Sequence, residues 1–322
     1  MDTSPPIRVV ALLNVMAGSI EDHRIEEMRE IVRSAFAARG ISCDVEALPG
    51  GRLVDAAKRA LQKAQRNEIR AIVAGGGDGT IHTIASVLAG TGVKLGILPL
   101  GTLNHFAKDL GIPMALQDAV DVVAAAHEVN VDVGEVNGIV FINNSSIGVY
   151  PYMVLDRERL RRTGLQKWTA MALAGLHMLR VFPVRRLRVR AEGLLEPYRT
   201  PCLFAGSNKY GLSLRALGRR ERLDGGELWF YIVKHQTRLS LLWFTFRSLL
   251  GLANSKHDLR VFGAKQADIG AHPQRKRLAV ALDGEVVFLR PPLHYRIRAG
   301  DLRVYAPRAV SDQVESKTAP DS

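Results

Sequence analysis

A glycine-rich segment with one aspartate and one threonine, GGGDGT (75–80), begins at the last residue of the apolar run IRAIVAG (69–75). Glycines let a phosphate approach backbone N–H groups, and a helix starting here adds its N-terminal N–H groups and positive dipole. Thr80 can cap that helix. Asp78 would repel phosphates unless a cation lay between them, so Gly76, Gly77, Asp78, Gly79 and Thr80 predict a phosphate site with Mg²⁺. A plain glycine turn with an exposed aspartate is the alternative.

A second polar loop lies within LPLGTLNHFAKDLGIP (98–113), after the apolar run KLGILPL (94–100). Gly101 permits a turn there, and Thr102 and Asn104 supply short polar side chains. Because parallel strands end at the same edge of a sheet, we expect the two loops to form one nucleotide site. Capping of the next helix by Thr102 or Asn104 explains the same residues equally well.

Two Asp-Gly pairs stand in the second half of the chain. Asp283-Gly284 lies between RLAVAL and EVVFL, and Asp224-Gly225 lies just before ELWFYIV. Asp-Gly between apolar runs is a strong hairpin signal, so a turn is the plain interpretation of both pairs. A turn can also hold a carboxylate beside an alcohol, where it serves as a general base.

These residues need elements to position them, and the first 130 residues alternate strand and helix patterns. Strands are predicted at 8–14, 41–48, 69–75 and 94–100, and helices at 21–38, 53–66, from Thr80 to Leu88 and from 104. This alternation predicts a doubly wound, mostly parallel α/β sheet with ligands at the carboxyl ends of its strands.

After residue 130 the apolar pattern changes to period two. VNVDVGEV and IVFINN flank Asn137-Gly138, and LRVRAEG, PCLFAGSN, ELWFYIV, LRVFGAKQADIG and RLAVALDGEVVFL continue it. The pattern predicts a mainly antiparallel β domain at 131–299, interrupted by helices near 165–181 and 238–253. We expect 300–308 to return to domain 1–130, and 309–322 to be a disordered tail.

Composition and charge narrow the class of partner. The chain of 322 residues is 47% hydrophobic and 24% charged, which is typical of a soluble globular protein. Two cysteines and no signal-peptide pattern favour the cytoplasm. Residues 151–300 hold 28 Lys/Arg against 11 Asp/Glu, whereas residues 1–150 have a net charge of −4. The basic segments 157–167, 185–190, 215–222 and 275–277 favour an anionic membrane surface, approached with Trp168, Trp243, Phe244 and Phe246. No nucleic-acid-binding motif accompanies them.

The motifs together resemble one family. GGGDGT, PLGTLNHFA, NVMAGS (14–19), LDGGELWFYIV (223–233) and ALDGE (281–285) have the order and spacing of the diacylglycerol kinase catalytic-domain family, soluble bacterial lipid kinases related to sphingosine and ceramide kinases. GGDGT alone is shared with NAD kinases, so the combination carries the resemblance. The resemblance implies two domains with ATP bound in the cleft between them.

The resemblance also implies roles for individual residues. The GGDGT loop would hold ATP phosphates, with Asn14 and Ser19 in the first nucleotide loop and Thr102 in the second. Asp224 is similar to a residue that binds a structural or regulatory Mg²⁺ in the family. Asp283 looks like the general base, and Glu285 like its metal or orientation support. His105 stands where the family commonly has Asp in GTxNDF, which puts the metal arrangement in question.

The sequence therefore predicts an ATP- and Mg²⁺-dependent lipid kinase acting on a hydroxyl of a membrane lipid, with diacylglycerol as the leading candidate. We expect a cytoplasmic enzyme associated peripherally with the inner face of the membrane, and homodimer formation is left open. One alternative is an NAD-kinase-like soluble phosphotransferase. Another is a non-catalytic lipid- or nucleotide-binding relative.

Overall fold

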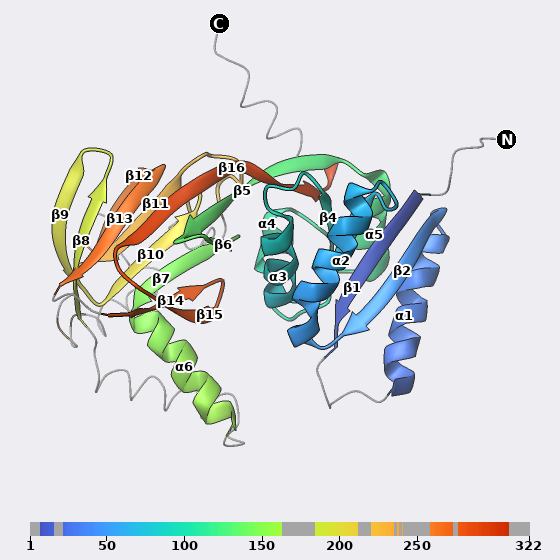
Figure 1. Cartoon of the computed structure of the whole chain (residues 1–322), viewed down its shortest axis with the longest axis horizontal. Coiled ribbons are helices and arrows are strands. Elements are labelled where there is room, and N and C mark those ends of the chain that lie inside the picture. Colours follow the sequence, from blue (N-terminus) through green and yellow to red (C-terminus); the bar gives the residue numbers. More distant parts are fainter. Residues whose placement is uncertain are drawn as a thin grey trace, which may run out of the picture. The chain divides into compact units, whose positions relative to one another are not determined.

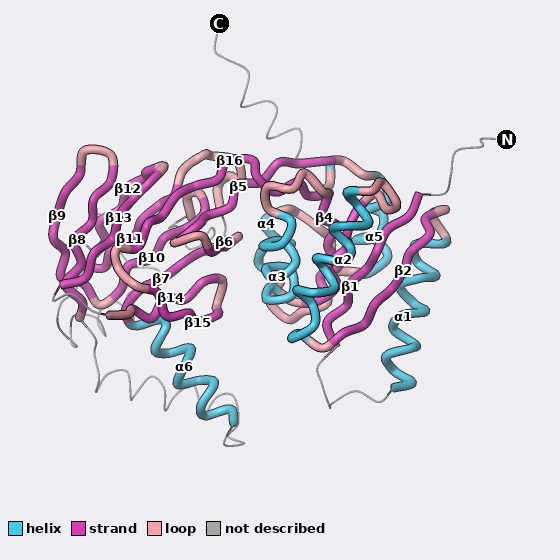
Figure 2. Tube along the Cα trace, in the orientation of Figure 1, coloured by secondary structure: helices cyan, strands magenta, loops and turns pink. Residues whose placement is uncertain are grey.

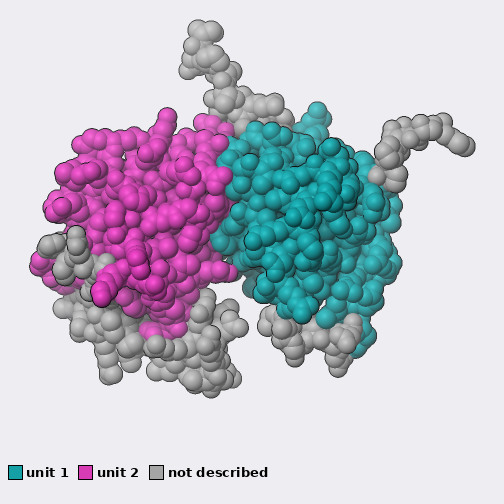
Figure 3. Space-filling model, in the orientation of Figure 1, with its two compact units in different colours: residues 1–132, 300–322 teal, residues 133–299 magenta. Residues whose placement is uncertain are grey.

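The structure is a computed structural model of the chain. It describes residues 7–15, 22–162, 184–211, 220–234, 237, 240, 258–272 and 276–308. The predicted helices at 165–181 and 238–253, their four aromatic residues and the predicted tail at 309–322 lie outside these ranges. Two compact units divide the chain, residues 1–132 with 300–322 (unit 1) and residues 133–299 (unit 2), as Figure 3 shows in two colours.

Unit 1 is built around parallel strands whose residues are almost all apolar, because helices cover both faces of such a sheet. Its strands are β1 (Ile7–Asn14), β2 (Ile41–Leu48), β3 (Ala71–Gly76) and β4 (Lys94–Pro99). Its helices are α1 (Asp22–Ala37), the 3₁₀ turn η1 (Gly50–Arg52), α2 (Leu53–Gln65), α3 (Asp78–Leu88), α4 (His105–Asp109) and α5 (Leu116–Ala125). The predicted α/β domain is confirmed.

The strand order β2-β1-β3-β4 determines where a ligand site can form. Across the sheet, the connection from β1 to β2 runs toward one edge, and the connection from β2 to β3 runs back toward the other edge. Right-handed crossovers therefore place α1 and α2 on opposite faces of the sheet. Consistently, α1 packs against α5, and α2 packs against α3, as Figure 1 shows for the second pair. The reversal leaves a switch point at the carboxyl ends of β1 and β3, where open α/β sheets bind ligands.

Two strands contribute residues to both units. These are β5 (Glu128–Val136) and β16 (Leu293–Tyr305). The last residues of β16 pair in parallel with β4 at Arg303 and Val304, and its first residues pair antiparallel with β13 (Gln266–His272). The sequence pattern did not predict β16.

Unit 2 is antiparallel, as predicted, and its strands make up most of its described residues (Figure 2). One sheet has the order β12-β11-β10-β7-β14-β15, and β16, β13, β8 and β9 follow one another in the other, with β5 and β6 beside them. The remaining elements are β6 (Ile139–Phe141), β7 (Asn144–Gly148), α6 (Val149–Arg162), β8 (Arg185–Ala191), β9 (Leu194–Thr200), β10 (Cys202–Ser207), β11 (Leu228–Val233), β12 (Leu259–Ala264), β14 (Leu278–Leu282) and β15 (Glu285–Leu289).

The core of unit 2 joins its two sheets. Buried apolar side chains from β8, β13 and β16 pack with those of β10, β11 and β14, for example Val189 with Phe230 and Val280 in one cluster. Each strand contributes alternate residues, which is the period-two pattern seen in the sequence. The alternation therefore determined which side chains the unit buries.

Three details differ from the sequence-based elements. IVFINN ends as a strand at Phe141, and Asn144 begins β7 in the other sheet. LRVFGAKQADIG is also two strands in different sheets, because the chain bends at Lys265, whose N–H donates to Glu192. The sequence analysis did not predict β9, because Pro197 within it argues against a strand. Sheets tolerate proline in an edge strand, which is the position of β9. No helix within the described ranges is both long and apolar enough to span a membrane.

Candidate functional site

The glycine loop of unit 1 joins the buried strand β3 to helix α3. Gly77 is the N-cap of α3, and Asp78 is its first residue, two positions earlier than predicted. The first N–H groups of an α-helix have no partner within the helix, and a glycine N-cap has no side chain to bind them. Gly77 and Asp78 are half-buried, and Gly79 is exposed. The loop therefore presents the backbone features that hold a phosphate.

The two predicted loops lie in contact through their glycines. A Cβ atom added at Gly101 would lie 2.3 Å from the Cα of Gly77, and one added at Gly77 would lie 3.4 Å from the Cα of Gly101. In addition, the Leu100 N–H donates to the Gly76 carbonyl at 3.1 Å. Only glycine at position 101 permits this approach, so the structure brings the loops together as expected.

The end of β1 joins the same site. The Asn14 side-chain amide donates to the Thr80 hydroxyl at 2.9 Å, and Thr80 is buried in the first turn of α3. This hydrogen bond spans the switch point between β1 and β3. Ser19, which we assigned to the same nucleotide loop, lies outside the described residues.

Asp78 and Asn104 hold the second loop in place. One carboxylate oxygen of Asp78 accepts the N–H of Phe106 at 3.3 Å, at the start of α4. Asn104 is buried with a left-handed φ of 50°, and its side-chain amide donates to the carbonyls of Pro99 and Gly101 at 3.1 and 2.8 Å. Its side-chain oxygen accepts the Gly101 N–H at 3.1 Å. Asn104 therefore shapes the loop, whereas a contact with nucleotide remains a prediction.

The other residues of this loop are exposed. Thr102 and His105 both face solvent, Thr102 on the loop and His105 as the first residue of α4. A hydroxyl in this position is accessible to a ligand. The imidazole of His105 supplies no carboxylate where the family commonly has one.

Asp283 occupies the predicted turn in unit 2. The two turn residues, Asp283 with φ 46° and Gly284 with φ 90°, join β14 to β15. The Asp283 carboxylate accepts three backbone N–H groups, from Ile142 at 2.7 Å, Asn143 at 2.8 Å and Asn144 at 2.9 Å. These three hydrogen bonds fix the direction of the carboxylate. The turn therefore also anchors a second segment of the chain.

Sequence reasoning missed segment 142–144, whose N–H groups bind the Asp283 carboxylate. It links β6 to β7, and the Asn144 carbonyl accepts the Asp283 N–H at 2.9 Å in return. The adjacent polar pair Asn143-Asn144, between two apolar strands, is the signal that could have singled it out.

The other two predicted acidic residues are placed differently. Both carboxylate oxygens of Asp224 accept hydrogen bonds of 3.0 Å from Arg222, and the Asp224 side chain is 14% exposed. Glu285 is exposed at the start of β15. Within the described ranges, no three His, Cys, Asp or Glu side chains gather as a ready-made metal site.

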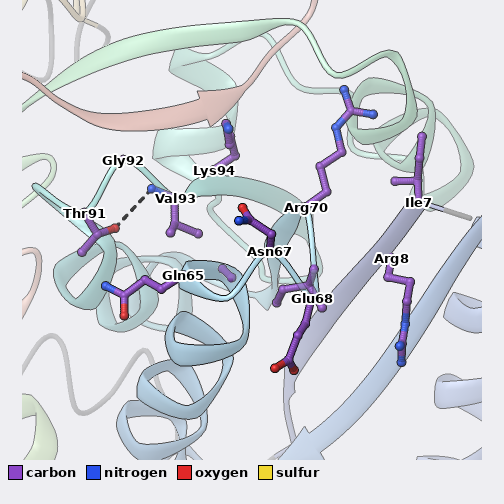
Figure 4. A pocket seen from close by; sticks show the side chains of 12 residues that line it. Ile7, Arg8, Gln65, Asn67, Glu68, Arg70, Thr91, Gly92, Val93 and Lys94 are labelled. Carbon is purple, nitrogen blue, oxygen red and sulfur yellow. Dashed lines mark hydrogen bonds between the residues drawn. The ribbon is translucent and has the colours of Figure 1, made fainter. Parts of the chain in front are cut away.

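A hollow of about 540 Å³ in unit 1 lies at the opposite edge of the parallel sheet. Ile7, Arg70 and Lys94, at the start of β1, just before β3 and at the start of β4, help to line it. Arg8 and Arg70 point in different directions there (Figure 4), and Arg8 pairs with Asp44 at 3.4 Å. Its cations do not converge on one point, so the glycine loops are the better candidate site.

Comparison with known proteins shows which domain the first part of the chain resembles. Residues 8–136 match the model of the diacylglycerol kinase catalytic domain. A probable lipid kinase YegS-like of Klebsiella pneumoniae is 41% identical over 138 residues, which is 42% of this chain and 46% of that protein. The probable lipid kinase YegS of Salmonella newport is 39% identical over 140 residues, 42% of this chain and 47% of that protein. The match therefore spans about half the length of these curated relatives.

Solved structures resemble the chain over a longer stretch. A diacylglycerol kinase from Bacillus anthracis superposes with a TM-score of 0.66 at 19% identity, covering 95% of this chain and 98% of that one. A putative diacylglycerol kinase from the same organism gives a TM-score of 0.71 at 20% identity, covering 95% and 99%. At this low sequence identity, the superpositions establish a shared fold and nothing more. Residues 8–136 of this chain thus resemble the diacylglycerol kinase catalytic domain, and the chain shares the fold of these solved structures.

Proposed function

We propose that this chain is an ATP-dependent lipid kinase that transfers the γ-phosphoryl group to a free hydroxyl of a membrane lipid, with diacylglycerol as acceptor. One observation carries the proposal. The glycine loops around Gly77 and Gly101 meet at the β1/β3 switch point, inside the segment that matches the diacylglycerol kinase catalytic domain. Such a site suits a nucleotide, because backbone N–H groups and a helix dipole favour phosphates.

In this proposal, unit 1 binds the phosphates of ATP. The amides at the start of α3 donate to phosphate oxygens, and Gly76 and Gly77 keep side chains out of their path. Asn14 and the buried Thr80 hold the end of β1 against α3 through their 2.9 Å hydrogen bond. The exposed hydroxyl of Thr102 is available to the same nucleotide.

Mg²⁺ fits Asp78 better than Asp224. Magnesium in phosphoryl-transfer sites commonly takes one or two carboxylates together with substrate phosphates, so Asp78 beside a phosphate-binding helix start is a sufficient protein ligand. When bound, the ion offsets charge on the phosphoryl oxygens. At Asp224 a cation would compete with the Arg222 guanidinium, which takes both carboxylate oxygens. We therefore place the ion at Asp78 alone.

Asp283 is proposed as the proton acceptor. Its carboxylate takes the proton of the lipid hydroxyl while the hydroxyl oxygen bonds to the γ-phosphorus and the bond to ADP breaks. The three amides of segment 142–144 hold the carboxylate in one direction, which reduces the reorganisation needed for proton transfer. Glu285, exposed one residue beyond the turn, is not needed for this step.

An exposed basic face of unit 2 supports a membrane-bound substrate. Along β8 the burial alternates, so Leu187 and Val189 face the core while three arginines lie exposed, and β9 adds a fourth with the exposed Leu195. These exposed arginines are Arg186, Arg188, Arg190 and Arg199. Arginines on one face attract anionic headgroups. Of the other basic segments, the side chains of residues 157–162 and the whole of residues 163–167, 215–219 and 275 lie outside the described part of the chain.

The test is a phosphoryl-transfer assay with radiolabelled ATP, with diacylglycerol, other hydroxyl-bearing lipids and NAD as acceptors. We expect label in the diacylglycerol product, and a fall of about 10²-fold or more in Asp283→Asn. ATP affinity should stay unchanged in that variant. Asp268→Asn, an exposed carboxylate that pairs with His294, is the matched control and should keep full activity.

Each of the other outcomes would support a different function for this chain. Label in NAD alone would establish the NAD-kinase-like alternative, and ATP binding without transfer to any acceptor would establish a non-catalytic relative. Full activity in Asp283→Asn would show that Asp283 is not the general base, but it would not contradict the proposed kinase activity. Asn also places an amide N–H where the carboxylate accepts backbone N–H groups, so the melting temperature of the variant must be measured beside its activity.

A further inference from the structure

Arg220 is a buried cation in a segment whose basic residues suggested a surface role. It belongs to RALGRRER (215–222), yet only 9% of Arg220 is exposed, whereas its neighbour Glu221 is exposed. Burying a guanidinium is costly unless its N–H groups find acceptors. Because Arg220 is buried, attraction to an anionic membrane does not explain this arginine.

Two acceptors of Arg220 lie on the segment that follows β6, and a third lies at the end of β10. One guanidinium nitrogen donates to the Ile142 carbonyl at 2.7 Å and to the Ser207 carbonyl at 3.4 Å. The other donates to the side-chain oxygen of Asn143 at 3.0 Å. Arg220 thus joins segment 142–144 to the end of β10.

The same segment binds Asp283 through its N–H groups. At Ile142 the carbonyl accepts from Arg220 and the N–H donates to the Asp283 carboxylate; at Asn143 the side chain accepts from Arg220 and the N–H donates to Asp283. Ile142 and Asn143 therefore link the buried guanidinium of Arg220 to the carboxylate of Asp283.

Other contacts leave the segment little freedom. The Asn143 carbonyl accepts the Ser207 N–H at 2.9 Å and the Tyr210 hydroxyl at 3.2 Å. Ile142 is fully buried, and Asn143 is 6% exposed. Arg220 binds both residues at once because its planar guanidinium has several donors in a fixed geometry, which a lysine ammonium lacks.

We infer that Arg220 is a positioning residue for Asp283: it fixes segment 142–144, whose amides in turn fix the carboxylate. The inference rests on the proposed function, in which Asp283 accepts the proton of the lipid hydroxyl. Catalytic groups lose rate steeply when misplaced by about 1 Å, so loosening the segment should slow transfer without weakening ATP binding in unit 1.

The experiment compares Arg220→Lys with Arg260→Lys, a matched control on β12 whose side chain is 48% exposed and lies 3.9 Å from Glu196. We expect kcat to fall about 10- to 100-fold in Arg220→Lys with an unchanged KM for ATP. The control should match the wild type. Hydrogen–deuterium exchange of the peptide that contains residues 142–144 should accelerate in Arg220→Lys and not in Arg260→Lys.

A double variant separates positioning from general damage. If Arg220 acts through Asp283, Arg220→Lys combined with Asp283→Asn should be no slower than Asp283→Asn alone. A further multiplicative loss in the double variant, or unchanged exchange of segment 142–144, would overturn the inference. Asn143→Ala, which removes one acceptor of Arg220, gives a second way to loosen the segment if Arg220→Lys fails to fold.

Failure of the proposed function gives a different result. A wild-type protein that phosphorylates no lipid would refute the lipid kinase, but the exchange of segment 142–144 would still report whether Arg220 holds it. Conversely, an active wild type with a fully active, normally protected Arg220→Lys would refute the inference and leave the kinase intact.

Discussion

Replacing Gly101 by alanine tests the contact between the two loops of unit 1. The added Cβ atom would lie 2.3 Å from the Cα of Gly77 and 2.7 Å from the side-chain oxygen of Asn104. Carbon atoms in contact prefer about 3.5–4.0 Å, so the loops would have to separate by more than about 1 Å. The neighbouring atom is backbone, which cannot rotate away as a side chain can.

The expected cost follows from these distances. Overpacking of a tight site costs about 1–3 kcal/mol, and a strained Asn104 would lose hydrogen bonds worth about 1 kcal/mol each. We therefore expect Gly101→Ala to lower the free energy of unfolding by about 3 kcal/mol. Gly77→Ala, with its nearest contact at 3.4 Å, should cost less, and Gly51→Ala, with nothing within 4 Å, should stay within about 0.5 kcal/mol of the wild type.

Urea denaturation and titration calorimetry with ATP measure the two consequences. Stability should rank Gly51→Ala above Gly77→Ala above Gly101→Ala, and only the variants at 77 and 101 should bind ATP more weakly. If Gly101→Ala is as stable as Gly51→Ala and binds ATP as well as the wild type, then the loops do not approach through these glycines, and the nucleotide assignment loses its geometric support.

Three further predictions concern charge and burial. Replacing Arg186, Arg188 and Arg190 by serine should weaken binding to phosphatidylglycerol vesicles, measured by sedimentation, by up to about 100-fold, because each basic group near the surface contributes about 1 kcal/mol. Substituting three exposed basic residues of unit 1 should have less effect. Equal binding of the wild type to phosphatidylcholine vesicles would contradict electrostatic docking. Arg296 and Arg298 hold the pKa of Glu135 below its usual range, so the stability lost in Glu135→Gln, about 1–2 kcal/mol, should be present at pH 7 and disappear as the pH falls through the folded-state pKa, as pH-dependent calorimetry can measure. Burial raises the pKa of the Cys43 thiol to about 12, so Cys43 should resist thiol reagents at pH 8 until the protein is unfolded, and rapid labelling of native protein would contradict its burial.

The sequence by itself determined many of the helices and strands of both units, although not β9 or β16, and it singled out several candidate site residues. Local patterns are sufficient for this, because apolar periodicity and turn residues act over a few neighbours: β2 spans the predicted residues 41–48, and Asp283-Gly284 forms the predicted turn. GGGDGT likewise placed a glycine loop between β3 and α3, although the helix starts at Asp78 and not at Thr80.

Only the tertiary structure decided which of these residues meet. The Gly77–Gly101 approach and the bonds from segment 142–144 to Asp283 join residues far apart in the chain, and no local pattern encodes such pairs. Burial is decided in the same way: Arg220 reads in sequence as one more surface cation, but the fold encloses it because Ile142 and Asn143 supply its acceptors. Sequence specifies the groups that can do chemistry, whereas packing between distant segments fixes their directions and partners.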